Sequence, residues 1–213
     1  MSKGLRREWE QMNSCHHCNQ PAWYQDRVTK AFLCLAHTRL EVRGPVSSPH
    51  PGPAPLAARV GTAADLPAVL AIWKHFWAED EMDCFGREYR AVDLDHLLVC
   101  DEDQVVGVLS YAVEREWEAI NIVALNVLPS HQGLGGAGKL MDMLEERARR
   151  LRIGRLLVAT SNDNLPALYW YQVRGFSILD ILLGAIEPNH SDDHLAGLGG
   201  IPVRDEIQLE KRL

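Results

Sequence analysis

The sequence lacks any long apolar run, and it lacks the basic-then-apolar start of an export signal. No apolar stretch approaches the roughly 20 residues that a membrane-spanning helix needs. The first residues, MSKGLRREWEQ, have no apolar segment behind their basic side chains, which excludes a secretory signal. The sequence therefore predicts no membrane partner and, by default, a cytoplasmic location.

Cysteine is scarce as well, with five in 213 residues, and without an export signal this argues against a disulfide scaffold. The chain is 46% hydrophobic and 24% charged, which is typical of a globular protein with a core. The net charge of −7 disfavours broad nucleic-acid binding and suits cationic partners.

Three of the five cysteines fall near the N-terminus in a metal-ligand pattern. Cys15-x-x-Cys18 and Cys34-x-x-His37 have the spacing of two zinc knuckles that together close a tetrahedral shell. A module of residues 1–43 is too small to bury enough apolar surface unaided, so we expect structural Zn²⁺ to stabilise it. Free thiols or a redox pair are the alternatives. The role of the module is open among binding a partner, forming a homodimer and packing on the rest of the chain.

A spacer follows this module. Residues 44–55, GPVSSPHPGPAP, hold five prolines and no charged side chain. Proline fixes φ and removes an amide donor, so this stretch predicts a semi-rigid linker. We therefore expect a small zinc-ribbon-like module at 1–43, a linker at 44–55 and a main domain at 56–213.

The main domain has the pattern of an α+β fold. Leu66, Val69, Leu70, Trp73, Phe76 and Trp77 fall on one face of an expected helix and are interpreted as core. A β-meander and then a β-α-β-α-β stretch follow, which predicts a mixed, mostly antiparallel sheet flanked by helices. The expected strands are 58–60, 96–100, 104–113, 120–127, 155–160, 176–183 and 206–209, and the later helices are 140–151 and 165–173.

A glycine-rich segment between a strand and a helix, VLPSHQGLGGAG (127–138), has the most chemical content. Glycines let the backbone approach a ligand, and the free amides of the following helix attract phosphate. Gly133, Gly135 and Gly138 also match the dinucleotide pattern G-x-G-x-x-G, but the glycines do not follow the strand directly and no acidic residue ends the next strand. A turn without a ligand is the remaining alternative.

Gln132-x-x-Gly135-x-Ala137, after a strand that ends in V-x-P, resembles the acyl-CoA loop of the GNAT superfamily of N-acetyltransferases. Further along, Asn164-x-x-Ala167-x-x-x-Tyr171-x-x-x-Gly175-Phe176 resembles the second conserved stretch of that superfamily. The order of expected elements from residue 56 onward agrees with this resemblance, which covers about three quarters of the chain.

The resemblance implies an acetyl-CoA site. In this family the strands on either side of the glycine-loop helix diverge, and the pantetheine arm enters the gap between them. Leu125 and Val127 would then offer main-chain groups to pantetheine and the thioester, and Asn164 would contact the CoA arm or cap a helix. The residues implied for the pyrophosphate are Gln132, Gly133, Leu134, Gly135, Gly136 and Ala137.

The resemblance also implies catalytic roles. Tyr171 matches the acid that protonates the departing thiolate, and a phenol is protonated at neutral pH. Many relatives place a glutamate eleven residues before the position of Gln132, but this chain has Asn121 there, which accepts no proton. Glu118, three residues earlier, is the candidate base, acting through a water molecule. The four acidic residues of 79–83 are interpreted as solvated loop charges.

These observations predict an acetyl-CoA-dependent N-acetyltransferase that acts on a primary amine by direct attack. The acidic main domain suits either a small cationic acceptor or a protein amine. Because Asn121 replaces an acid, the alternative is a non-catalytic CoA-binding regulatory protein whose zinc module recruits a partner.

Overall fold

The computed structural model describes residues 24–25, 32–33, 56–186 and 197–213. The chain divides into two units, Met1–Gly52 and Pro53–Leu213, and each is described by itself. The described residues of the first unit form one antiparallel pair, β1 (Tyr24–Gln25) with β2 (Phe32–Leu33). Cys15, Cys18, Cys34, His37 and the segment 44–55 lie outside the described residues. The zinc site, the linker and the domain boundaries therefore stay predictions.

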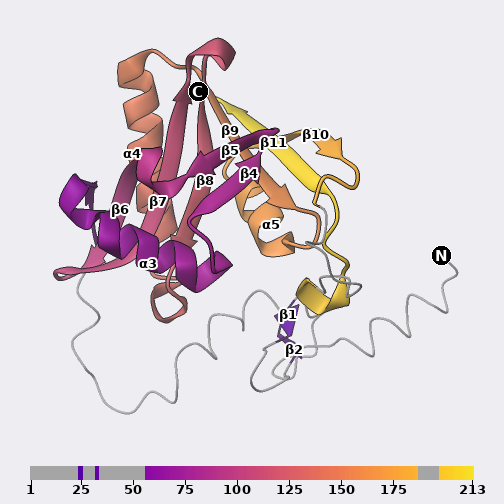
Figure 1. Cartoon of the computed structure of the whole chain (residues 1–213), viewed down its shortest axis with the longest axis horizontal. Coiled ribbons are helices and arrows are strands. Elements are labelled where there is room, and N and C mark those ends of the chain that lie inside the picture. Colours follow the sequence, from indigo (N-terminus) through magenta and orange to yellow (C-terminus); the bar gives the residue numbers. More distant parts are fainter. Residues whose placement is uncertain (1–23, 26–31, 34–55, 187–196) are drawn as a thin grey trace, which may run out of the picture. The chain divides into compact units, whose positions relative to one another are not determined.

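The second unit is built on a seven-stranded sheet with the strand order β10-β11-β9-β8-β7-β6-β3 (Figure 1). All neighbouring strands are antiparallel except β8 and β9, which are parallel. The strands of the sheet are β3 (Ala57–Val60), β6 (Asp95–Asp101), β7 (Gln104–Glu114), β8 (Ala119–Val127), β9 (Arg155–Ser161), β10 (Ser177–Leu182) and β11 (Glu206–Arg212).

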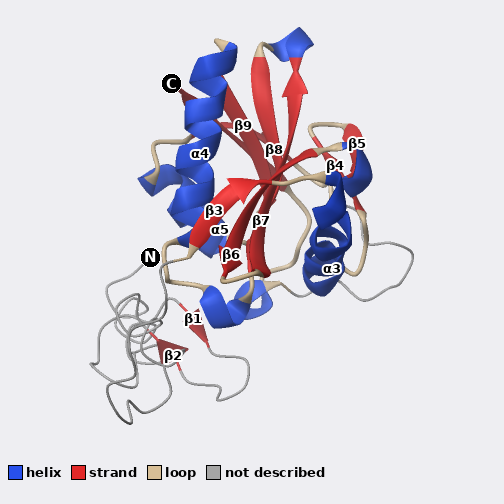
Figure 2. Ribbon diagram, turned by 90° about the vertical axis from the view of Figure 1, so that its left-hand side faces the viewer, coloured by secondary structure: helices blue, strands red, loops and turns tan. Residues whose placement is uncertain are grey.

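Helices cover both faces of this sheet (Figure 2). On one face, α4 (Gly136–Leu151) and α5 (Leu165–Val173) pack over a core that includes Leu140, Leu144 and Tyr171. On the other face, α3 (Leu66–Trp77) and a separate hairpin of β4 (Glu81–Cys84) and β5 (Arg87–Arg90) enclose a second core around Trp73 and Tyr89. None of the helices in the described part of the chain is long and apolar enough to cross a membrane.

The first helix lies where the sequence predicts it, but its buried face is slightly rotated. Val69, Ile72 and Trp73 are the residues it buries completely, whereas Trp77 remains 36% exposed. The Trp73 indole donates to the Ser110 hydroxyl of β7 at 3.1 Å, which anchors the helix to the sheet. The interpretation of Trp73 as core is confirmed. Ile72 is buried in the core of the structure, whereas Trp77, which was expected there, is not.

The hairpin β4–β5 is the element that the sequence does not predict. Its two-residue turn, Phe85-Gly86, has φ values of 53° and 67°. Positive φ at both turn residues is the geometry of a type I′ hairpin, for which Asn-Gly or Asp-Gly is the strong sequence signal. Phe-Gly is a weak one. Consequently Glu81 and Asp83, interpreted as loop charges, lie in a strand.

The remaining helices and strands match their predicted positions within a few residues. The mixed, mostly antiparallel sheet with flanking helices confirms the predicted α+β class for the second unit. A dinucleotide-binding fold requires a mostly parallel sheet, so this sheet argues against the interpretation of the glycine loop as a dinucleotide-binding motif.

Candidate active site

Strands β8 and β9 separate partway along their length. Their parallel pairing covers only Ile120, Asn121 and Ile122, opposite Leu156, Leu157 and Val158. Beyond these pairs β8 continues to Val127 and β9 to Ser161 without pairing to each other. The carboxyl ends of both strands therefore border an opening in the sheet.

The main chain of β8 directs groups that do not pair with β7 toward this opening. Leu128 N–H bonds to Val106 O on β7 at 2.8 Å, and the register pairs Val127 with Gly107 and Leu125 with Leu109. In an antiparallel ladder, residues alternate between facing the partner strand and facing away from it. The main-chain groups of Leu125 and Val127 thus point away from β7, toward the side where β9 has departed.

The glycine loop follows β8 at this edge. Gln132 does not offer its main-chain amide to a ligand, because that amide bonds to Pro129 O at 3.4 Å, and its side-chain Nε2 donates to Val127 O at 2.9 Å. By contrast, the N–H groups of residues 133–138 have no acceptor among the described residues. These groups form the first turn of α4 and the loop before it, where unpaired amides and the positive end of the helix dipole favour an anion.

Two glycines of the loop adopt backbone conformations that other residues rarely adopt. Gly133 has φ 77° and Gly135 has φ 84°, and a Cβ added at either would meet nothing within 4 Å. The loop thus combines left-handed turns with open space on the Cβ side of both glycines. The next glycine differs, since a Cβ on Gly136 would lie 3.3 Å from side-chain atoms of Leu56 and Val99, a tight contact that those side chains would have to relieve.

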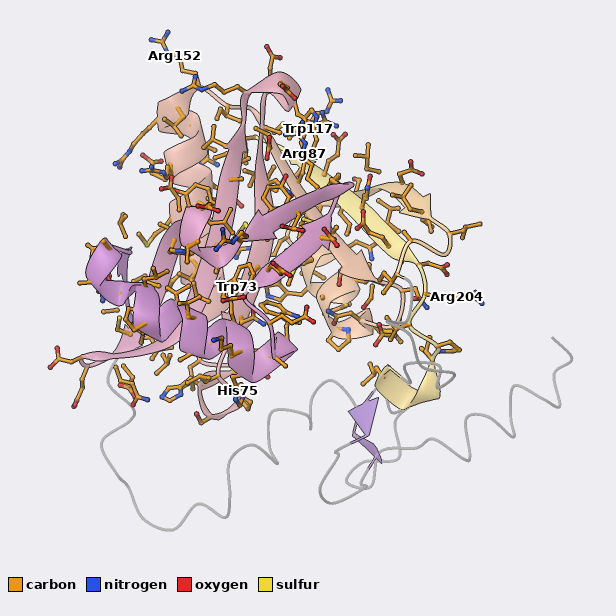
Figure 3. All side chains as sticks on the ribbon, in the orientation of Figure 1. Trp73, His75, Arg87, Trp117, Arg152 and Arg204 are labelled. Atoms are coloured by element: carbon orange, nitrogen blue, oxygen red, sulfur yellow. The ribbon has the colours of Figure 1, made fainter. Side chains whose placement is uncertain are left out.

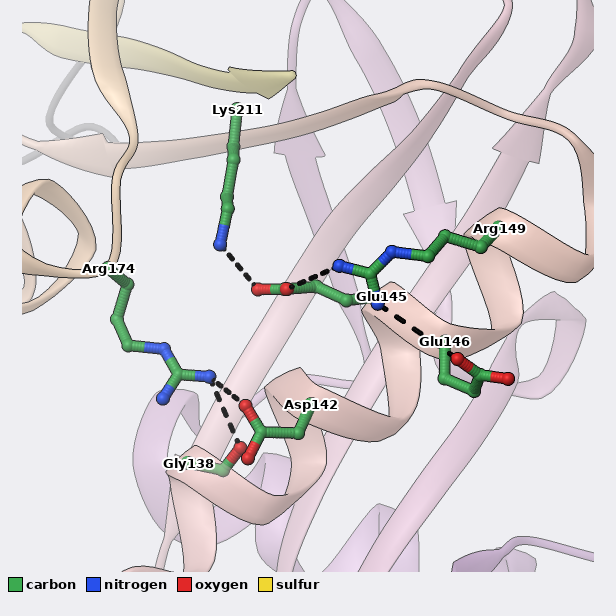
Figure 4. Close-up of polar contacts among 7 residues, drawn as sticks. All are labelled: Gly138, Asp142, Glu145, Glu146, Arg149, Arg174 and Lys211. Carbon is green, nitrogen blue, oxygen red and sulfur yellow. Dashed lines mark hydrogen bonds and ion pairs between the residues drawn. The ribbon is translucent and has the colours of Figure 1, made fainter. Parts of the chain in front are cut away.

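Helix α5 is joined to the start of α4 by Arg174. Its guanidinium donates to Gly138 O at 3.4 Å and pairs with Asp142 (Figure 4). Farther along α4, Lys211 of β11 binds Glu145 at 2.6 Å. The Arg174 contacts thus hold the C-terminal end of α5 against the start of α4, and the Lys211 contact ties α4 to β11.

Asn164 caps α5. Its Oδ1 accepts the Ala167 amide at 3.3 Å, so the helix-cap role considered for it is present. Because it follows the carboxyl end of β9, it also lies beside the opening in the sheet.

Tyr171 lies on the inward face of α5 and is 6% exposed. Its ring packs edge-on against Trp170 and Phe176, each with centroids 5.2 Å away. Burial raises the pKa of the Tyr171 phenol above its usual value of about 10. The hydroxyl makes no hydrogen bond with another described residue, so it remains available as a donor.

Glu118, the predicted base, lies at the other end of β8. It precedes the strand in a left-handed conformation and is exposed. Seven residues separate it from Leu125, which at ~3.3 Å per residue is about 23 Å. It lines a cavity of about 830 Å³ with Trp117, Arg147 and Arg155 near the β7–β8 turn. Leu125, Val127, the glycine loop and Asn164 thus lie at the carboxyl ends of β8 and β9, whereas Glu118 lies at the opposite end of β8.

Sequence reasoning singled out Asn121 but missed the buried polar residues that share its sheet face, Glu206 and Gln208. Glu206 and Gln208 of β11 and Asn121 of β8 are each at most 9% exposed. The signal in the sequence is the alternation of Glu206, Gln208 and Glu210 with the apolar Ile207 and Leu209, which places three polar side chains on one face.

Comparisons with known proteins agree with this geometry. A profile described as the acetyltransferase (GNAT) family matches residues 66–176, more than half of the chain. The uncharacterized protein YxbD of Bacillus subtilis (strain 168) is 30% identical over 149 residues, which are 68% of this chain and 91% of that protein. An amino-acid acetyltransferase of Pasteurella multocida (strain Pm70) is 24% identical over 127 residues, 58% of this chain but only 27% of that protein.

Two solved structures share the fold. An IAA acetyltransferase from Bacillus cereus ATCC 14579 superposes with a TM-score of 0.58 at 21% identity, covering 74% of this chain and 99% of that one. A GNAT family acetyltransferase from Elizabethkingia anophelis with acetyl-CoA bound has a TM-score of 0.57 at 21% identity, covering 75% and 99%.

Proposed function

Because the chain belongs to the acetyltransferase (GNAT) family, we propose that it transfers an acetyl group from acetyl-CoA to a primary amine. The observation that supports the proposal is that two features lie together at the carboxyl ends of the central strands β8 and β9. Six main-chain amides at residues 133–138, which have no acceptor in the described part of the chain, stand beside the opening between β8 and β9. A CoA molecule whose diphosphate binds these amides and whose pantetheine arm enters the opening would use both features.

The residues around the opening fit the predicted roles. Gly133, Gly135 and their neighbours would bind the diphosphate through main-chain donors, while Leu125, Val127 and Asn164 would hold the arm. Gln132 would act differently from the prediction, by fixing the loop to Val127 through its side chain. The thioester supplies the activated acetyl group, and a main-chain amide aimed at its carbonyl oxygen would stabilise the oxyanion that develops there.

Direct attack by the amine, without an acyl-enzyme intermediate, is consistent with the environment of the cysteine thiols in the described residues. Both free cysteines there, Cys84 and Cys100, are buried. Burial raises the pKa of the Cys84 thiol to about 12, so it stays protonated at neutral pH and is a poor nucleophile. An acyl-cysteine intermediate on Cys84 is therefore disfavoured, and the buried Tyr171 phenol would protonate the leaving thiolate.

The experiment for this proposal is incubation of the full chain with acetyl-CoA and a panel of amines, with detection of free thiol. The panel comprises spermidine, an aminoglycoside and a lysine-containing peptide. We expect acetyl-CoA binding by calorimetry and thiol release that requires an amine. Binding without turnover on every amine would support the alternative of a CoA-binding regulatory protein. No binding at all would refute both.

The N-terminal metal site is a separate proposal. We expect about one Zn²⁺ per chain in the purified protein, because the four-ligand pattern closes one tetrahedral shell. The C34S substitution removes one ligand and should lower the zinc content measured by atomic emission, whereas C100S, outside the pattern, should leave it unchanged. Equal zinc content in C34S and the parent chain would count against the site.

A further inference from the structure

A network of buried polar side chains lies beneath the β4–β5 hairpin. The Tyr89 hydroxyl donates to Glu114 at 2.8 Å, and Glu114 pairs with Arg87 at 2.7 Å. Arg87 itself lies 4.3 Å from the Trp117 ring, next to it in Figure 3. The charge of Glu114 is thus balanced within the described structure.

Glu206, the second buried carboxylate of the network, has no such balance. Its Oε1 accepts the Phe85 amide at 3.3 Å and the Gln208 side-chain amide at 2.7 Å. No cationic side chain pairs with it among the described residues. A carboxylate that is 9% exposed and unpaired is costly, unless a ligand brings the positive charge.

Asn121 provides an independent sign of a missing partner. The residue is fully buried, its Nδ2 donates to the Cys84 sulfur at 3.5 Å, and its Oδ1 has no hydrogen-bond partner among the described residues. Buried polar atoms are nearly always paired, so an unpaired acceptor calls for a donor. Cys84 contacts Asn121 and the next residue, Phe85, contacts Glu206, so both polar side chains reach the same end of the β4–β5 hairpin and are treated as one cluster.

The cluster borders the opening between β8 and β9. Asn121 is in the last stretch where these strands pair, and Glu206 pairs with Ser161, the final residue of β9. Ile207 and Leu209 pack into the core beneath α4 and α5, so Glu206 faces the opposite side. The Glu206 side chain therefore approaches the opening from the sheet face opposite to α5, the helix that carries Tyr171.

We propose that Glu206 and Asn121 bind the ammonium group of the acceptor and that Glu206 accepts its proton. The inference rests on the proposed acetyl transfer and narrows the acceptor to a primary alkylammonium on a slender chain, because the cluster is buried. An N–H proton passes to Glu206 Oε2 and on to solvent, and the freed lone pair forms the C–N bond as the C–S bond breaks. The thiolate takes the Tyr171 proton, and the second N–H proton released by the new amide returns to the Tyr171 oxygen.

The test compares E206Q with E210Q in the full chain. Glu210 lies on the same strand and the same sheet face but pairs with Arg155 at 2.7 Å, so it is a matched control. With spermidine as acceptor at pH 7, we expect kcat/KM to fall at least about 30-fold in E206Q and less than about 3-fold in E210Q. Acetyl-CoA affinity should be unchanged in both, and E206Q keeps an acceptor oxygen for Phe85, so thermal unfolding should change little.

The pH dependence separates proton acceptance from structural support. Because free amine becomes abundant in solution as the pH rises, the defect of E206Q should shrink at pH 9.5. Adding N121D to E206Q returns a carboxylate to the cluster and should recover part of the rate. A defect in E206Q no larger than in E210Q, or one that is the same at both pH values, would overturn the inference. Failure of the parent chain to bind acetyl-CoA or acetylate any amine would instead refute the proposed function.

Discussion

The substitution Y171F is expected to lower kcat by about 100- to 10,000-fold, the range that a positioned general acid contributes. The hydroxyl makes no hydrogen bond within the described structure, so its removal deletes the proton donor and little else. The ring contacts to Trp170 and Phe176 are kept by phenylalanine. Acetyl-CoA affinity and folding stability should therefore change little.

The measurement is steady-state thiol release, with calorimetry for acetyl-CoA binding. Y169F is the matched control, because Tyr169 lies on the same helix but is 54% exposed. It should retain nearly full activity. Equal rates for Y171F and Y169F would remove Tyr171 from the mechanism while leaving the binding site intact.

Burial also sets the pH range over which Tyr171 works. Because its pKa is raised in the folded chain, the phenol stays protonated below pH 10, and its ionisation should not produce an alkaline fall in kcat below that pH. The folding stability linked to the protonated form is fully present below the unfolded-state pKa and is lost as the pH rises through the higher folded-state pKa.

Most of the fold can be predicted because its signals are local. The apolar stripes of α3 and α4 and the turns between strands are each defined by residues that lie within a few positions of one another in the sequence. The β4–β5 hairpin escapes prediction because Phe85-Gly86 is an unusual turn and the strands are rich in charge. Its placement depends on contacts such as Phe85 with Glu206, which are 121 residues apart.

The same distinction applies to the site. The glycine loop and Tyr171 belong to short motifs, so the sequence is enough to single them out. The candidate base is different, because a carboxylate near the opening is defined only when the sheet is assembled. Glu118 is close to Asn121 in sequence but lies beyond the paired end of β8, whereas Glu206 reaches the cluster from the last strand. Sequence proximity along a strand is a poor guide here, since each residue adds about 3.3 Å.

The substitution G135D is expected to weaken CoA binding by about 100-fold or more. Gly135 precedes α4 with φ 84°, and a side chain there would extend into open space beside the amides that have no acceptor among the described residues. Two like charges about 4 Å apart repel by about 4 kcal/mol at an effective dielectric constant of ~20, and each ~1.4 kcal/mol is tenfold in affinity. Stability should change by about 1 kcal/mol or less, because aspartate tolerates left-handed φ and its charge favours a helix N-terminus.

The matched variant G135N separates charge from shape. Asparagine has the same size and tolerates the same backbone conformation, so it should bind CoA more tightly than G135D at low salt, and the difference should shrink in 1 M salt, where charges are screened beyond about 3 Å. G184D controls for the backbone, since Gly184 has φ 68° and equally open surroundings. If the glycine loop were only a turn that binds no ligand, CoA affinity should be equal in G135D, G135N and G184D. A charge-dependent loss confined to residue 135 would place a phosphate group of CoA on the amides of the loop, and an equal loss with 3′-dephospho-CoA would identify that group as the diphosphate.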